Sequence, residues 1–152
     1  MWIVSVLIAQ VAGIVGSMFT MPSVAGWYQT INRPSWNPPG WLFGPVWVSL
    51  YTLMGIAAYL VWQKRDLGQV VKTALIVYGV QLLLNTLWSI LFFGMKNPGL
   101  ALVEILILLS TIILTTVLFY KIRPVTLWLL LPYILWVSFA SFLNYTIWSL
   151  NR

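Results

Sequence analysis

The spacing of charged residues divides this chain into long apolar segments. The uncharged runs cover residues 1–32, 34–63, 73–95, 105–120 and 124–151. A helix needs roughly 17–25 mostly apolar residues to cross the hydrocarbon of a bilayer, and every run reaches or approaches that length. The pattern predicts an all-α integral membrane protein whose single domain, residues 1–152, is a bundle of five transmembrane helices. The helices are expected at about 2–21, 42–63, 70–93, 99–120 and 125–148.

Prolines mark several of the predicted helix boundaries. Pro22 is expected to end the first helix, because proline has no N–H to donate and its ring clashes with the preceding turn. Pro45 suits the first turn of the second helix, and Pro132 is expected to kink the fifth. Residues 22 to about 40 therefore form the one long connection of the chain.

This connection is rich in proline, glycine and tryptophan. A connection of such length is usually functional or disordered, and the tryptophans argue against disorder. Tryptophan also gathers at membrane–water interfaces as an aromatic belt. Belt residues do not require the Pro38-Pro39 turn that separates Trp36 from Trp41. We therefore favour a folded loop that acts as a lid over one end of the bundle.

Small residues form a stripe along the first helix. Ala9, Gly13 and Ser17 recur at a spacing of four. Such a stripe allows close helix packing, either against another helix of the bundle or across a homodimer interface. Gln10 and Thr20 also fall near this face, and the pattern leaves both arrangements open.

Two amides and one carboxyl group lie within predicted helices. Gln81 and Asn85 share a face of the third helix with Trp88, and an unpaired amide in hydrocarbon must face the bundle interior or a cavity. Glu104 in the fourth helix would cost roughly 2.5–3.5 kcal/mol by insertion scales, so it must pair or become protonated. A hydrogen bond to a neighbouring helix and a role toward a ligand remain equally open for Glu104.

Composition narrows the chemistry further. Hydrophobic residues make up 61% of the chain and charged residues 7%, where soluble domains carry roughly 25% charged residues. Cysteine and histidine are absent, which excludes a disulfide framework, a thiolate nucleophile, a histidine-ligated haem and a Ser-His-Asp triad. The net charge of +6 comes from basic residues scattered singly or in pairs. They suit lipid headgroups better than nucleic acid, and no cofactor or metal is expected.

The distribution of basic residues also predicts an orientation. Five lie on the side of the N-terminus, namely Lys64, Arg65, Lys72, Lys121 and Arg123. Three lie on the side of the predicted lid, namely Arg33, Lys96 and Arg152. Positive residues favour the cytoplasmic side, so the N-terminus is expected in the cytoplasm and the lid outside, in a bacterial cell membrane. No basic side chain precedes the first apolar run, so a cleaved signal peptide is not expected.

Aromatic and amide residues of three helices could build a binding slot. If their faces converge, they form an apolar cavity with a few amides in its wall, as is usual for small-molecule sites. The tryptophans expected at the lid and slot are Trp27, Trp36, Trp41, Trp47, Trp88 and Trp136. The other expected wall residues are Tyr51, Gln81, Asn85, Phe92 and Asn144. A planar apolar ligand such as a porphyrin or a sterol would suit this slot. The alternative is that these aromatics only fill the core.

The same residues carry a resemblance to a known family. The segment Arg33-Pro34-Ser35-Trp36-Asn37-Pro38-Pro39-Gly40-Trp41, followed by Gly44-Pro45-Val46-Trp47, resembles the signature of the TspO/MBR family. This family includes the tryptophan-rich sensory proteins and the mitochondrial translocator protein, or peripheral benzodiazepine receptor. Further matches are Gln81-Leu82 with Asn85, Trp88 and Phe92-Phe93-Gly94, Ala101-Leu102-Val103-Glu104, and Pro132-Tyr133 with Trp136, Ala140 and Leu143-Asn144-Tyr145.

The resemblance implies five transmembrane helices, often in a homodimer, with a pocket beneath the first loop. Family members bind porphyrins such as protoporphyrin IX, cholesterol and benzodiazepine-type ligands. By motif, the pocket would be lined by Trp36, Trp41, Trp47, Tyr51, Asn85, Trp88, Phe92, Trp136, Ala140 and Leu143. The cholesterol-recognition pattern is incomplete here, because Arg152 lies one residue too far from Tyr145. Porphyrin binding is therefore favoured over cholesterol binding.

Three functions are consistent with these expectations. The first is a membrane receptor or sensor that binds tetrapyrroles. The second is an enzyme that degrades porphyrin in light with oxygen, a reaction that the resemblance associates with tryptophans matching Trp47 and Trp136. The third is a tetrapyrrole or sterol transporter, although no paired halves or inverted repeats are visible. Binding ranks first, turnover second and transport third.

Overall fold

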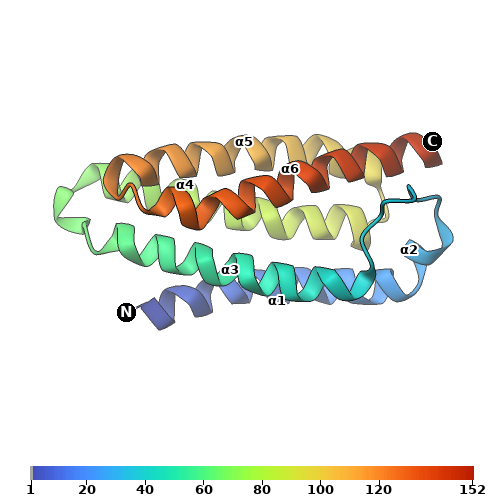
Figure 1. Ribbon diagram of the computed structural model, residues 1–152, viewed down its shortest axis with the longest axis horizontal. Helices are drawn as coiled ribbons and strands as arrows, with labels where there is room; N and C mark the ends of the chain where they lie inside the picture. Colours follow the sequence, from blue (N-terminus) through green and yellow to red (C-terminus); the bar gives the residue numbers. More distant parts are fainter. Residues whose placement is uncertain (1) are drawn as a thin grey trace.

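The computed structural model describes residues 2–152 and consists of five long helices that lie lengthwise beside one another (Figure 1). In chain order the elements are α1 (Trp2–Ala25), α2 (Trp27–Thr30), α3 (Gly40–Trp62), the short 3-10 helix η1 (Arg65–Leu67), α4 (Gln69–Ser89), the π-helical turn η2 (Ile90–Gly94), α5 (Pro98–Ile122) and α6 (Thr126–Asn151). The lid, defined as residues 26–39 and including α2, lies at the same end of the bundle as the C-terminus (Figure 1).

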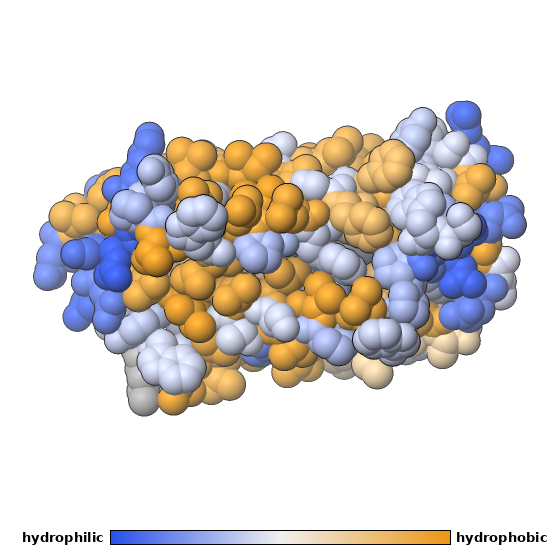
Figure 2. Space-filling view, viewed as in Figure 1, coloured by the Kyte–Doolittle hydropathy of each residue, from blue (hydrophilic) through white to orange (hydrophobic). Residues whose placement is uncertain are grey.

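The five long helices are long and apolar enough to span a membrane. The face of the bundle in Figure 2 has an apolar band between two hydrophilic ends. Backbone groups in hydrocarbon must be satisfied within the protein, and helices do this without help from water. The chain is therefore an integral, multi-pass membrane protein, and the predicted five-helix, all-α class is confirmed.

The first helix runs past its predicted end. Pro22 lies inside α1, which continues to Ala25. Proline removes only its own N–H donor, and here it lies in the final turns of the helix, where the Pro22 carbonyl accepts a bond from the Gly26 amide at 3.2 Å. The helix therefore tolerates Pro22, and the connection between long helices begins at Gly26.

The small residues of α1 pack within the bundle. Ala9 is fully buried, and a β-carbon added to Gly13 would lie 2.5 Å from the ring of Tyr51 on α3. The same close approach recurs at Gly55 of α3, where an added β-carbon would lie 2.5 Å from the backbone of Val6. Close packing inside the bundle therefore accounts for Ala9 and Gly13. The homodimer stays a prediction.

Glu104 has neither of its two expected roles within residues 2–152. Its side chain is buried in α5, yet neither carboxyl oxygen has a hydrogen-bond partner. It also lies outside the wall of the main pocket. A buried polar group without a partner destabilises the folded state, so Glu104 is a local cost for which the fold offers no compensating contact.

Candidate functional site

A large pocket opens among the helices at the lid end of the bundle. Its volume is about 730 Å³, which falls within the usual range of roughly 300–1,000 Å³ for small-molecule sites. Residues of α1, α2, α3, α4, η2 and α6 contribute to its wall. No acidic or basic side chain from residues 2–152 lines it. The wall therefore suits a largely apolar ligand and offers no group for ordinary acid–base catalysis.

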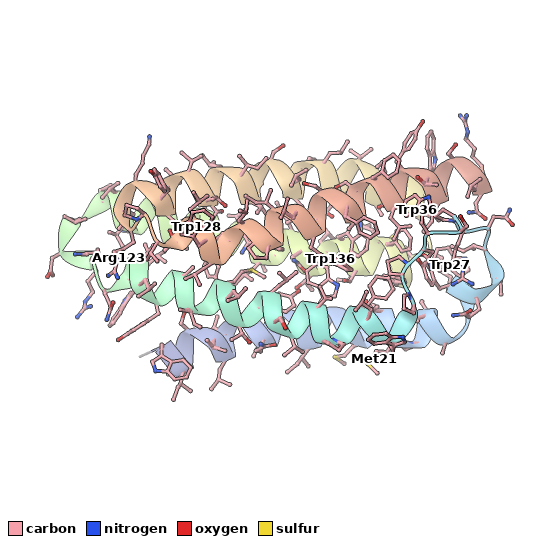
Figure 3. All side chains as sticks on the ribbon, in the orientation of Figure 1. Met21, Trp27, Trp36, Arg123, Trp128 and Trp136 are labelled. Carbon is pink, nitrogen blue, oxygen red and sulfur yellow. The ribbon has the colours of Figure 1, made fainter. Side chains whose placement is uncertain are left out.

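Aromatic rings from several elements contribute to this wall. Trp47 stacks on Tyr51 of α3, with ring centroids 5.7 Å apart, and meets Trp136 of α6 edge to face at 6.4 Å. Trp88 of α4 stacks on Phe92 of η2 at 5.2 Å. Offset and edge-to-face pairs of this kind are the favoured arrangements of aromatic rings. Figure 3 shows Trp136 near the middle of the bundle, away from the hydrophilic ends.

A chain of buried hydrogen bonds, which we call the floor, extends into the bundle from Tyr51 and Asn85 of the pocket wall. The Tyr51 hydroxyl donates to Asn85 Oδ1 at 2.6 Å, and Asn85 Nδ2 donates to the Tyr133 hydroxyl at 2.6 Å. That hydroxyl in turn donates to Gln81 Oε1 at 2.7 Å. Gln81 Nε2 completes the chain with a contact of 3.7 Å to the sulfur of Met54. Three helices are thereby joined, because these residues belong to α3, α4 and α6.

The amide of Asn144 is also engaged within the protein. Its Oδ1 accepts a bond from Trp88 Nε1 at 3.0 Å, and its Nδ2 donates to the Pro98 carbonyl at 2.8 Å. The side-chain amides of Gln81, Asn85 and Asn144 therefore all have hydrogen-bond partners within the protein. Asn85 and Asn144 line the pocket and at the same time hold aromatic side chains in position. Their role toward a ligand stays a prediction.

Hydrogen bonds and ring contacts attach the lid to the bundle. The Tyr28 hydroxyl donates to Asn37 Oδ1 at 2.6 Å. At the end of α6, Asn151 Oδ1 accepts from the Asn32 amide at 2.9 Å, and Asn151 Nδ2 donates to the Asn32 carbonyl at 2.8 Å. Trp36 stacks on Phe142 with centroids 5.3 Å apart. The predicted lid thus exists as a folded segment, attached to α6 and, through ring contacts of Trp27 and Tyr28 with Phe92 and Phe93, to η2.

Most of the predicted ligand-binding residues meet in the pocket. Ten of the thirteen line it, namely Trp41, Trp47, Tyr51, Asn85, Trp88, Phe92, Trp136, Ala140, Leu143 and Asn144. Three do not. Trp27 lies beside a second, shallower hollow, and Trp36 packs against α6. Gln81 is buried within the hydrogen-bond chain of the floor, where its side-chain carbonyl accepts from Tyr133.

Sequence reasoning missed the contribution of α1. Gln10, Gly13, Ser17, Thr20 and Met21 all line the pocket. The first four already share a helical face in the sequence, and that face was interpreted only as a packing surface. Phe43 and Phe139 were missed as well, since a single phenylalanine in a transmembrane segment carries no distinguishing signal.

These features define a class: a polytopic α-helical membrane protein with a tryptophan-lined pocket beneath a folded lid. Comparison with protein families identifies the family within this class, because the model of the TspO/MBR family matches residues 5–149. The chain belongs to the TspO/MBR family, whose membrane proteins are named as sensory or translocator proteins.

Individual relatives support this assignment over nearly the whole chain. The chain is 44% identical to the tryptophan-rich protein TspO of Archaeoglobus fulgidus, over 98% of this chain and 95% of that protein. It is 43% identical to the protein of the same name from Chlorobaculum tepidum, over 91% and 88% of the two chains. It is also 41% identical to the human translocator protein, over 91% and 82%.

Proposed function

We propose that this protein is a membrane receptor for planar, largely apolar molecules such as protoporphyrin IX, which it binds in the tryptophan-lined pocket. The observation that carries the proposal is the pocket itself, which has a volume of about 730 Å³ and is lined by both the Trp47–Trp136 pair and the Trp88–Phe92 stack. Aromatic rings in the wall suit a flat π-system, which gains from ring contacts.

Tryptophan fluorescence of the protein in lipid vesicles tests this proposal. Protoporphyrin IX should quench the emission saturably, and Trp47→Ala should weaken the apparent affinity about tenfold or more, since losing one aromatic contact costs roughly 1–1.5 kcal/mol beyond the area lost. Trp128→Ala is the matched control, because Trp128 lies on α6 with 70% of its surface exposed and far from the pocket. Non-saturable quenching, or equal effects of the two variants, would count against a specific site.

A second candidate function is oxygen-dependent photodegradation of the bound porphyrin. It is favoured by the contact between Trp47 and Trp136 and by the edge-to-face approach of Tyr133 to Trp47 at 6.4 Å. These oxidisable rings would lie beside a light-excited ligand, with molecular oxygen as the oxidant. Absorbance of the bound porphyrin should then decay in light and air, and should persist when both tryptophans are replaced by phenylalanine. Equal decay in that double variant would exclude the assignment.

We further propose that the N-terminus faces the cytoplasm and that the lid faces the opposite side. Five basic residues lie at the N-terminal end of the bundle and three at the lid end, and cytoplasmic segments are enriched in Lys and Arg. Reporter fusions after Arg33 and after Arg65 test this. A reporter active only in the cytoplasm should work after Arg65 alone, and the reverse result would invert the topology.

A further inference from the structure

Arg33 of the lid lies directly behind the pocket wall. Its guanidinium carbon is 5.1 Å from the centroid of the Tyr28 ring, and its Nη2 donates to Gln29 Oε1 at 3.3 Å. Tyr28 and Gln29 both line the pocket, although Arg33 itself does not. Arg33 is half-buried, whereas Gln29 is exposed. The guanidinium group is therefore one side chain away from the interior of the pocket.

The contacts of Gln29 place this positive charge at the lid end of the pocket. Gln29 Nε2 donates to the Val24 carbonyl at 3.0 Å, and Cγ1 of Val24 lies 3.2 Å from the position of a β-carbon added to Gly40. Gly40 is the first residue of α3. Trp47 follows it by seven residues, which corresponds to roughly 10 Å at 1.5 Å per residue. The charge and the tryptophan rings thus lie at different depths of the same pocket.

No carboxylate of the described residues 2–152 pairs with Arg33. The chain has two acidic residues, Asp66 and Glu104. Asp66 lies in η1, in the green segment at the end of the bundle away from the lid (Figure 1), and Glu104 is buried in α5. A guanidinium group has five N–H donors, and the hydrogen bond of Arg33 to the neutral amide of Gln29 uses one of them. The remaining donors and the charge suit an anion from outside the chain.

We propose that Arg33 binds a carboxylate on the edge of the ligand, while the flat apolar body of that ligand contacts the tryptophans deeper in the pocket. The inference rests on the proposed function and adds to it the class of ligand, a planar carboxylic acid, and its orientation. In this arrangement the carboxylate replaces Gln29 Oε1 as the acceptor of the Arg33 bond. Arg–carboxylate pairs are often bidentate, and charge-assisted hydrogen bonds are roughly twice as strong as neutral ones. The exchange of acceptors therefore favours the bound ligand.

Protoporphyrin IX has the required form, because its two propionate groups lie on one edge of an otherwise apolar macrocycle. No basic side chain from residues 2–152 lines the pocket wall, and an ionised carboxylate without a partner is strongly unfavourable in apolar surroundings. The propionate edge therefore points toward Arg33 at the lid, and the opposite, apolar edge points toward Trp47 and Trp136.

The dimethyl ester of protoporphyrin IX separates the charged contact from the ring contacts. The ester has the same macrocycle as the diacid but no carboxylate. In vesicles of zwitterionic phosphatidylcholine, saturable quenching of tryptophan fluorescence gives the dissociation constant of each compound. Arg33→Gln should weaken binding of the diacid roughly tenfold and change binding of the ester less than about twofold. Equal weakening of both compounds would show that Arg33 acts only on the structure of the lid, and would overturn the inference.

Arg152→Gln is the matched control for net charge. Arg152 lies at the C-terminus, at the same end of the bundle as the lid (Figure 1), and its guanidinium carbon is 5.1 Å from the ring of Trp148. Neither residue lines the pocket. Because this variant removes the same charge from the same end, a general attraction of the diacid to that surface would weaken equally in both variants. Arg152→Gln should leave the affinity for the diacid unchanged, and an effect equal to that of Arg33→Gln would overturn the inference.

Arg33→Lys tests whether the charge itself is needed. Lysine keeps the positive charge but loses the planar fork of donors, so this variant should bind the diacid more tightly than Arg33→Gln and less tightly than the unsubstituted protein. No gain over Arg33→Gln would count against a charged contact. Unchanged binding of the diacid by Arg33→Gln would overturn the inference and leave the proposed function standing, whereas absence of saturable quenching by either compound in the unsubstituted protein would refute the proposed function.

Discussion

Replacing Asn85 tests the hydrogen-bonded floor of the pocket most directly. Asn85 accepts from the Tyr51 hydroxyl and donates to the Tyr133 hydroxyl, both at 2.6 Å. In Asn85→Ala the Tyr51 hydroxyl loses its acceptor, whereas Tyr133 still donates to Gln81. One buried donor is thus left without a partner, at a cost of roughly 1–3 kcal/mol.

The membrane setting lowers this expected cost. Hydrogen bonds between transmembrane helices average about 0.6 kcal/mol in double-mutant cycles, because the unfolded state in the membrane also finds partners. We therefore expect Asn85→Ala to lower the free energy of unfolding by about 0.5–2 kcal/mol. Equilibrium unfolding in mixed micelles, titrated with a denaturing detergent and followed by circular dichroism, measures this change.

A double-mutant cycle with Tyr51→Phe isolates the bond itself. If the bond exists as described, the two changes together should cost less than the sum of the single changes, with a coupling of about 0.5–2 kcal/mol. Ser110→Ala serves as a control, because Ser110 lies on the exposed face of α5 and bonds only to the Leu106 carbonyl of its own helix. Additivity within about 0.3 kcal/mol would refute the proposed floor.

Three further changes probe other parts of the fold. Gly55→Ala should destabilise the bundle by about 1–3 kcal/mol, because its β-carbon would collide with the backbone of Val6; unfolding titrations would show this, and an unchanged midpoint would contradict the close contact. Glu104→Leu should stabilise by about 1–3 kcal/mol, since it removes a buried carboxyl group without a partner in residues 2–152; Glu104→Gln is the control, and a loss of stability in the leucine variant would reveal a role for the acid. Lys96→Gly should raise the thermal midpoint of unfolding by an amount equivalent to about 0.5–1 kcal/mol, because Lys96 has a φ of 55° that glycine adopts without strain. A lower midpoint would show that contacts of the lysine side chain stabilise the fold by more than its backbone conformation destabilises it.

Part of the pocket was predictable because its residues carry a strong local signal. Tryptophans and amides are rare inside transmembrane helices unless they face other protein, so Trp47, Asn85 and Trp136 could be assigned to the interior from helical spacing alone. What these groups do there was not predictable. Asn85 and Asn144 are neutral donors and acceptors that suit either a ligand or a neighbouring side chain, and only the packing of the helices decides between these partners.

The boundary at Pro22 illustrates a different limit. Proline lowers helix stability by removing one hydrogen bond and crowding the preceding turn, yet packing of the residues that follow can hold the helix together. Pro22 therefore remains helical in α1. Pairing across helices, by Ser23 with Phe93, further fixes this final segment against η2, and such a contact has no signature in the chain.

The amino-acid sequence by itself determined the membrane environment, the number of helices and the presence of an aromatic interior. These follow from hydropathy and segment length, which are sums over neighbouring residues. The tertiary structure decided that α1 contributes to the pocket wall and that the amides of Asn85 and Asn144 bond to aromatic side chains. Each of these depends on how closely two helices approach, and that distance is set by single atoms on both, such as the missing β-carbons of Gly13 and Gly55.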